Sequence, residues 1–119
     1  MRKFLVLMAF LLNGVMQLYA QDIKVTKFER NITSLIASMD PVYDNAGEAC
    51  AVIRFLVRDD GFEIEPNLGV LKRDNRIGEV RLWVPVGTKR ITLRHQGAMP
   101  LSYEIPMTLE SKVTYDAVL

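Results

Sequence analysis

The feature that most constrains the fold is a period-two alternation in residues 101–109, LSYEIPMTL. Apolar side chains occupy every second position: Leu101, Tyr103, Ile105, Met107 and Leu109. Side chains of a β-strand point alternately to its two faces, so this spacing predicts a strand with one face on a core and the other in water. Pro106 has no N–H for a ladder and therefore predicts an edge strand, a bulge or a break.

Two further segments, GEVRLWVP and TKRITLRH (residues 78–85 and 88–95), show the same alternation. They predict two antiparallel strands joined as a hairpin, with Pro85 ending the first strand and Gly87 supplying the unusual backbone angles of the turn. Residues 49–57, ACAVIRFLV, contain one polar side chain, Arg54. Such a run predicts a central strand that is covered on both faces or nearly so.

The remaining segments are shorter. We expect a strand with a bulge near Lys27 at residues 22–30 and two short strands at residues 62–66 and 68–72. We expect a turn-rich loop at residues 73–78 and a strand that continues a hairpin at residues 112–119. Residues 31–39 fit either one or two helical turns or an irregular segment. About seven strands with frequent turns predict an all-β fold, a small antiparallel β-sandwich.

The N-terminus has the order of a secretory signal peptide. Arg2 and Lys3 precede an apolar run at residues 4–12, and Ala20 is a small residue suited to the position before cleavage. The sequence therefore predicts a signal peptide at residues 1–20 and one domain at residues 21–119, exported to the periplasm or the cell surface. A spanning helix needs about 20 apolar residues, so no membrane span is expected after cleavage.

The charge balance and the cysteine count exclude some classes of protein. Without Arg2 and Lys3, 13 basic residues stand against 14 acidic ones, a net charge of about −1. There is no basic excess to neutralise phosphates, so nucleic acid is not an expected partner. Cys50 is the single cysteine, which rules out an internal disulfide, and its apolar strand predicts a small buried side chain rather than a nucleophile.

No pattern predicts catalysis, a cofactor or a metal. His95 is the only histidine, and nothing around the serines resembles a nucleophile elbow. Acidic residues gather in two stretches, residues 40–48 and 59–65, without the spacing of a calcium loop, and both suit turns. We therefore expect a protein that is not an enzyme.

The outward positions of the predicted hairpin are the candidate binding patch: Arg81, Trp83, Arg90 and Arg94. An indole beside guanidinium groups on a solvent-facing sheet is typical of a binding surface. The alternative is a solvated charged face, with Trp83 under a second core layer.

Two passages resemble PEGA-like domains of exported Bacteroidetes envelope proteins. Residues 84–119 contain Pro85, Gly87 and Gly97 at the turns of the second half of such a module, with Ala98 in place of its usual aromatic residue. Residues 28–57 resemble the front of these domains through Asp44, Asn45, Gly47, Glu48, Cys50, Ala51 and Ile53. The resemblance implies a small β-sandwich that serves as a non-catalytic accessory module.

The expected function is an exported, non-enzymatic binding domain at the cell envelope. It would dock to an envelope protein or a polysaccharide through a sheet edge near Pro106 or through the patch described above. Two alternatives remain open: a small secreted hydrolase or hydrolase inhibitor, and a subunit of a surface fibre that exchanges a terminal strand such as residues 22–30. The sequence leaves the oligomeric state undetermined.

Overall fold

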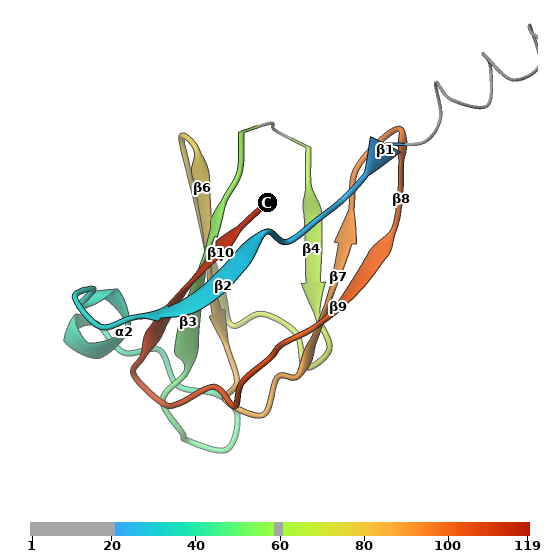
Figure 1. Cartoon of the computed structure of the whole chain (residues 1–119). Helices are drawn as coiled ribbons and strands as arrows, with labels where there is room; N and C mark the ends of the chain where they lie inside the picture. The colour runs from blue at the N-terminus through green and yellow to red at the C-terminus, as the bar shows by residue number, and fades with distance from the viewer. Residues whose placement is uncertain (1–20, 59–60) are drawn as a thin grey trace, which may run out of the picture.

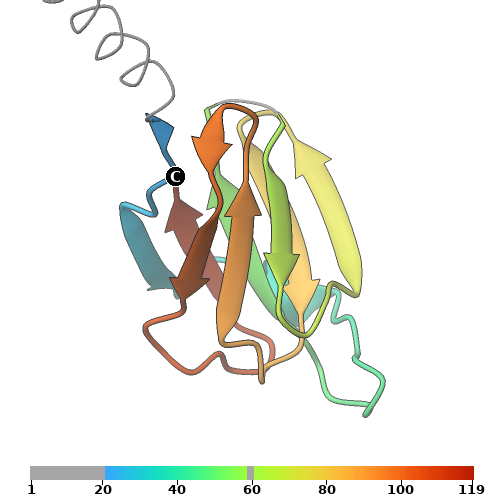
Figure 2. The ribbon, with the colours of Figure 1, turned by 90° about the vertical axis from the view of Figure 1, so that its right-hand side faces the viewer.

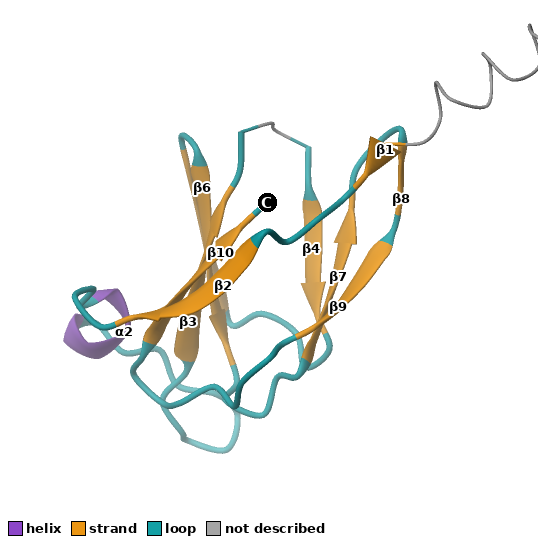
Figure 3. Cartoon of the chain, in the orientation of Figure 1, coloured by secondary structure: helices purple, strands orange, loops and turns teal. Residues whose placement is uncertain are grey.

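The computed structural model describes residues 21–58 and 61–119, which lie mostly in β-strands (Figure 1 and Figure 3). The strands are β1 Gln21–Asp22, β2 Lys27–Asn31, β3 Ala51–Leu56, β4 Glu63–Pro66, β5 Lys72–Arg76, β6 Glu79–Val84, β7 Arg90–Arg94, β8 Ala98–Met99, β9 Leu101–Glu104 and β10 Thr114–Val118. One short helix, α2 Ile36–Met39, follows β2. The predicted signal peptide, residues 1–20, lies outside the described residues.

The strands form two main sheets that face each other (Figure 2). The larger sheet has the order β2-β10-β3-β6-β5, and the smaller has the order β4-β7-β9. A short parallel pair, β1 with β8, lies beside them. The all-β prediction is confirmed. The prediction of purely antiparallel pairing is wrong, because β10 also runs parallel to β3 and lies between β3 and β2.

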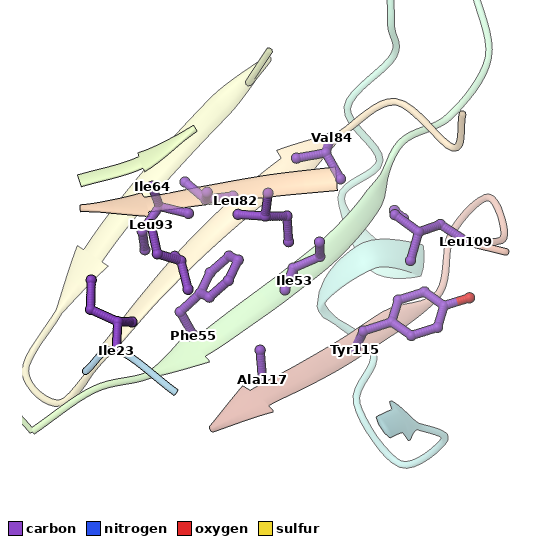
Figure 4. Close-up of a cluster of buried hydrophobic side chains, with 12 residues drawn as sticks. Ile23, Ile53, Phe55, Ile64, Leu82, Val84, Leu93, Leu109, Tyr115 and Ala117 are labelled. Carbon is purple, nitrogen blue, oxygen red and sulfur yellow. The ribbon is translucent and has the colours of Figure 1, made fainter. Parts of the chain in front are cut away.

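The core fills the space between the two sheets (Figure 4). The larger sheet contributes Ile53, Phe55, Leu82, Val84 and Tyr115, and the smaller sheet contributes Ile64, Ile91 and Leu93. Each of these side chains is almost completely removed from water. Full burial of an aliphatic or aromatic side chain stabilises the fold by roughly 1.5–3 kcal/mol, so this shared layer holds the two sheets together.

Two strand predictions are confirmed in detail. The run at residues 49–57 forms β3, which lies in the centre of the larger sheet between β10 and β6. In residues 101–109, the even-numbered positions are exposed and the odd-numbered ones are partly or fully buried, as the alternation predicts. β9 pairs only with β7 among the described strands and is therefore an edge strand, and it ends at Glu104, two residues before Pro106.

The predicted hairpin between residues 78 and 95 does not form. β6 pairs with β3 and β5, whereas β7 pairs with β4 and β9, so the two strands belong to opposite sheets. The turn between them, closed by a bond from Thr88 N to Pro85 O (3.0 Å), carries the chain from one sheet to the other. Gly87 does not adopt a positive φ there; a Cβ on it would lie 3.3 Å from Leu68 Cδ1, so glycine leaves room for that side chain.

Three other local predictions also need correction. Residues 112–119 do not continue a hairpin from β9, since β10 joins the opposite sheet. The predicted loop at residues 73–78 is mostly strand β5, which begins at Lys72, so the strand placed at residues 68–72 is largely a loop. Residues 31–39, left open by the sequence, contain the single turn α2.

The N-terminal residues 21–31, which we call the strap, close one side of the two-sheet body. β1 pairs with β8 next to the smaller sheet, and β2 pairs with β10 at the edge of the larger sheet. The chain is not in a strand at residues 23–26, so a change of sheet takes the place of the predicted bulge near Lys27. Phe28 contacts Tyr103 and Tyr115, with ring centroids 6.0 and 5.9 Å apart, and this aromatic cluster seals the side.

Candidate binding surface

The four predicted patch residues do not share a surface. Arg81 and Trp83 lie on the outer face of the larger sheet, opposite the core side chains of β6. Arg90 and Arg94 lie on the outer face of the smaller sheet, on either side of the buried Ile91 and Leu93. Because the two sheets face each other, their outer faces point in opposite directions. The correction follows from the sheet crossing at the turn after β6, which separates the two halves of the expected patch.

Trp83 is buried, with 4% of its surface exposed. It packs with Cys50, Val52 and Ala37, the last of these from α2. This small cluster is a second apolar layer on the outside of the larger sheet, as in the alternative given for Trp83. Lys72 covers the ring, with Nζ 4.7 Å from the centroid, and the indole N–H has no hydrogen-bond acceptor among the described residues.

Arg81 belongs to a half-buried ion network rather than to an open cationic patch. Its guanidinium donates to Glu79, which also accepts from Arg54, and Arg54 in turn reaches Asp116. Arg54 and Arg81 are direct cross-strand partners, a like-charged arrangement that is unfavourable unless it is compensated. Glu79 lies between the two cations and provides that compensation.

The pKa of Glu79 reflects this position. Burial opposes ionisation of its carboxyl group, but hydrogen bonds from Arg81 and Arg54 outweigh burial, and the pKa lies below its ordinary value. The pKa of Arg54 is raised by its hydrogen bond to Glu79, against the opposing effect of burial. Both groups are therefore charged at neutral pH and occupied with each other.

Arg90 and Arg94 form exposed ion pairs on the smaller sheet. Arg90 Nε lies 2.7 Å from Glu104 Oε1, and Arg94 Nη1 lies 2.8 Å from Glu65 Oε1. All four side chains are about half exposed or more, so each pair is worth at most about 1 kcal/mol. This face is a set of balanced charges and not a cationic surface.

The other candidate residues have structural contacts. Cys50 is 1% exposed, as predicted for a buried thiol, and burial, followed by the nearby Asp44 carboxylate, raises its pKa. The His95 ring packs against Phe62 with centroids 4.5 Å apart, and its Nδ1 lies 3.0 Å from the carbonyl oxygen of Gln96.

The acidic stretch at residues 40–48 forms a turn. Asp44 Oδ1 accepts from the backbone N–H groups of Ala46 and Glu48, both at 2.9 Å. In the described ranges, 21–58 and 61–119, no three His, Cys, Asp or Glu side chains are placed to hold a metal ion. Asp59 and Asp60 of the second stretch lie outside those ranges.

The structure reveals a surface that the sequence did not suggest, which we call the apolar projection: Ile32, Leu35 and Met39. These side chains are 83%, 58% and 77% exposed. Leu35 and Met39 are four residues apart, and the bond from Met39 N to Leu35 O (2.9 Å) places them on the same side of the helical turn. Figure 1 shows α2 standing out from the body of the two sheets.

Polar contacts fix the base of the apolar projection. Asn31 Oδ1 accepts from Thr33 N and Ser34 N, both at 3.2 Å, while its Nδ2 donates to Asp116 at 3.0 Å. On the other side, Ala37 is anchored against Trp83 in the second apolar layer. The projection is thus held in place at its start by Asn31 and in its middle by Ala37, although its own side chains contribute little to the core. The sequence signal was present as Leu35 and Met39 at helical spacing, but it did not tell whether they point inward or outward.

Comparison of the chain with protein-family models, with curated proteins and with solved structures gives no significant match. Within the part of the chain that the structure describes, no helix has the length and apolar character to cross a membrane.

Proposed function

We propose that this protein is an exported, non-enzymatic accessory domain of the cell envelope, a small PEGA-like β-sandwich that docks to a protein partner. The signal-like order of residues 1–20 supports export, and the resemblance at the turns and core positions supports the class. The binding role rests on one observation, the apolar projection of Ile32, Leu35 and Met39. Exposed apolar side chains on an anchored segment are typical of protein interaction sites.

The chemistry of the projection favours a protein over a polysaccharide. Its three side chains are aliphatic or a thioether and offer no flat ring for a sugar to stack on. Trp83, the residue expected to do this, is covered by α2 and Lys72. The matching partner surface is therefore an apolar groove.

The test is capture of envelope proteins with matched variants. Leu35→Ser with Met39→Ser removes the apolar side chains, and Met99→Ser is the control because Met99 is similarly exposed, at 71%, in a different strand. We expect a defined envelope protein to be lost from the first variant and kept by the control. If the same bands are captured by all three proteins, the projection is not the docking site.

Export is tested separately from docking. Mass spectrometry of the protein recovered from the cell should give an N-terminus near Gln21, the residue after the predicted cut. Recovery of the chain with Met1 and Arg2 still attached, in the cytoplasm, would contradict export but leave the docking test standing.

The alternative of strand exchange keeps one specific observation in its favour. The strap is N-terminal, and β2 is an edge strand whose removal would uncover β10. A fibre subunit needs such an edge to receive a strand from the next copy. This alternative predicts domain-swapped oligomers in which the strap crosses between copies. The charge-reversal experiment described in the next subsection, with its control variant on β2, distinguishes such oligomers from a dimer formed through β4 and β5.

A further inference from the structure

The side of the molecule opposite the strap has two open edges. β4 ends the smaller sheet and pairs only with β7, and β5 ends the larger sheet and pairs only with β6, among residues 21–58 and 61–119. The two strands lie on the same side of the body, as Figure 2 shows in light green and yellow. We call this the open side, defined by residues 63–76. Backbone N–H and C=O groups on the outer edge of each strand are available to another strand.

The open side also carries exposed apolar side chains on an anchored loop. Leu68, Val70 and Leu71 lie between β4 and β5 and are 54%, 38% and 36% exposed. Asn67 fixes the start of this loop, because its Oδ1 accepts from Lys89 N (3.0 Å) and Arg90 N (3.3 Å). The end is fixed by a bond from Leu71 N to Trp83 O (2.9 Å).

The two edges of the open side carry opposite charge. β4 contributes Glu63 and Glu65, both exposed, and no cation of its own; Glu65 is paired with Arg94 of the neighbouring β7, and Glu63 has no such ion pair among the described residues. β5 has the sequence KRDNR, three cations against one carboxylate, and four of its five side chains are exposed. Strands with charges of opposite sign attract when placed side by side, whereas two like edges repel.

The direction of the strands fixes how two copies would fit. The loop at residues 67–71 joins β4 to β5, and the two strands run in opposite directions in different sheets, as the arrows in Figure 2 show. A two-fold axis parallel to the strands exchanges the two sheets but keeps the strand directions. It therefore brings β5 of one copy antiparallel to β4 of the other, twice, and brings the two loops at residues 67–71 together at the same end.

We infer that the open side is a homodimer interface, in which β5 of each copy pairs with β4 of the second copy. The inference explains three features at once: two open edges on one side, their opposite charge, and exposed apolar side chains on a rigid loop between them. In the competing arrangement β5 pairs with β5 of the second copy. Lys72 of one copy would then lie opposite Arg76 of the other, and the two Asp74 side chains would lie opposite each other, so that like charges face like charges. A dimer of this kind does not use the apolar projection, so it stands or falls independently of the proposed function.

The test is charge reversal followed by mixing, measured by sedimentation velocity of the purified protein over a wide range of concentration. One variant carries Lys72→Glu and Arg76→Glu, which makes both edges acidic; the other carries Glu63→Lys and Glu65→Lys, which makes both basic. We expect each alone to dimerise at least about tenfold more weakly than the wild type, and an equimolar mixture to recover dimers as heterodimers. Recovery on mixing is the result that repulsion or misfolding alone would not give.

A matched control lies on the edge strand of the opposite side. Lys27→Glu with Arg30→Glu reverses two cations of β2 that are in exposed ion pairs, as Arg76 is, and should leave dimerisation unchanged. Leu68→Ser tests the loop without touching the charges and should weaken the dimer, and circular dichroism shows that each variant is folded. The inference is wrong if the wild-type protein stays monomeric at every concentration, or if the mixture of the two variants does not recover dimers. It is also wrong if only the β2 control loses the dimer, and that result would favour strand exchange.

Discussion

The strap side and the open side of this small fold differ in whether the edges of their sheets are covered. On one side, the strap runs from the short β1–β8 pair, which lies next to the smaller sheet, to the edge of the larger sheet, and Phe28 joins Tyr103 and Tyr115 in an aromatic cluster. On the other side, β4 and β5 end their sheets without a covering segment, and a loop between them exposes apolar side chains. A chain with a modest core can seal one side with a segment such as residues 21–31, and the sheet edges on the other side stay uncovered among the described residues.

The largest expected effect is on the sealed side. Phe28→Ala removes a partly buried ring that contacts two tyrosines, and we expect it to lower the free energy of unfolding by about 2–3 kcal/mol, below the range for a fully buried phenylalanine. Urea denaturation followed by circular dichroism measures the change. A loss below about 0.5 kcal/mol, the usual size for a surface position, would mean that the strap is not part of the folded body.

A smaller effect is expected from one hydrogen bond at the base of the same cluster. The hydroxyl of Tyr115 accepts from the backbone N–H of Glu110 at 2.8 Å, and the tyrosine is 1% exposed. Tyr115→Phe leaves that N–H without its partner and should cost about 1–2 kcal/mol of stability. Thermal unfolding measures it, and an unchanged midpoint would show that water replaces the hydroxyl.

The ion network on β6, β3 and β10 of the larger sheet predicts a dependence of stability on pH. The pKa of Glu79 is lower in the folded protein than in the unfolded chain, so its contribution is fully present above the ordinary carboxyl pKa near 4.3 and is lost as pH falls through the folded value. Stability should therefore decline as pH falls below about 4.3. In Glu79→Gln this part of the decline should be absent, at a cost of about 1 kcal/mol at neutral pH. Denaturant titrations at several pH values compare the two proteins; parallel curves would contradict the assignment.

The smallest effect is expected on the open side. Leu71→Ala shortens a side chain that is 36% exposed on a loop, and we expect it to change stability by no more than about 0.5 kcal/mol. Paired with Phe28→Ala in the same denaturation experiment, it measures the contrast between the sides directly. A loss from Leu71→Ala as large as that from Phe28→Ala would mean that the loop belongs to the core and is not a surface for a partner.

The sequence patterns predicted which face of a strand is buried more accurately than they predicted which strands lie side by side. The alternation at residues 101–109 identified the correct inward side chains, and the apolar run at residues 49–57 indicated a strand covered on both faces, because burial is reflected in the local pattern of a strand. Which strand lies next to which is not local. The turn from Pro85 to Thr88 reads as a hairpin in either case, and only the packing of the whole domain sends β7 to the other sheet.

The same reasoning explains the errors at the candidate site. The sequence predicts a turn-rich loop at residues 73–78, yet most of this segment is the edge strand β5, where charged side chains are common. For Trp83 the sequence leaves two positions open, an exposed patch and a second core layer, and the second is observed because α2, itself undetermined from the sequence, covers that face through Ala37. Both outcomes depend on which distant segment pairs with a strand or packs on its face, and the neighbouring residues in the chain do not determine that.

The most direct test of the contrast between the sides is amide hydrogen exchange at low and high protein concentration. The account predicts that β4 and β5 gain protection as concentration rises, together with the loop between them, while β2 keeps the same protection throughout. Exchange that is independent of concentration at residues 63–76, or that changes only at residues 27–31, would contradict it.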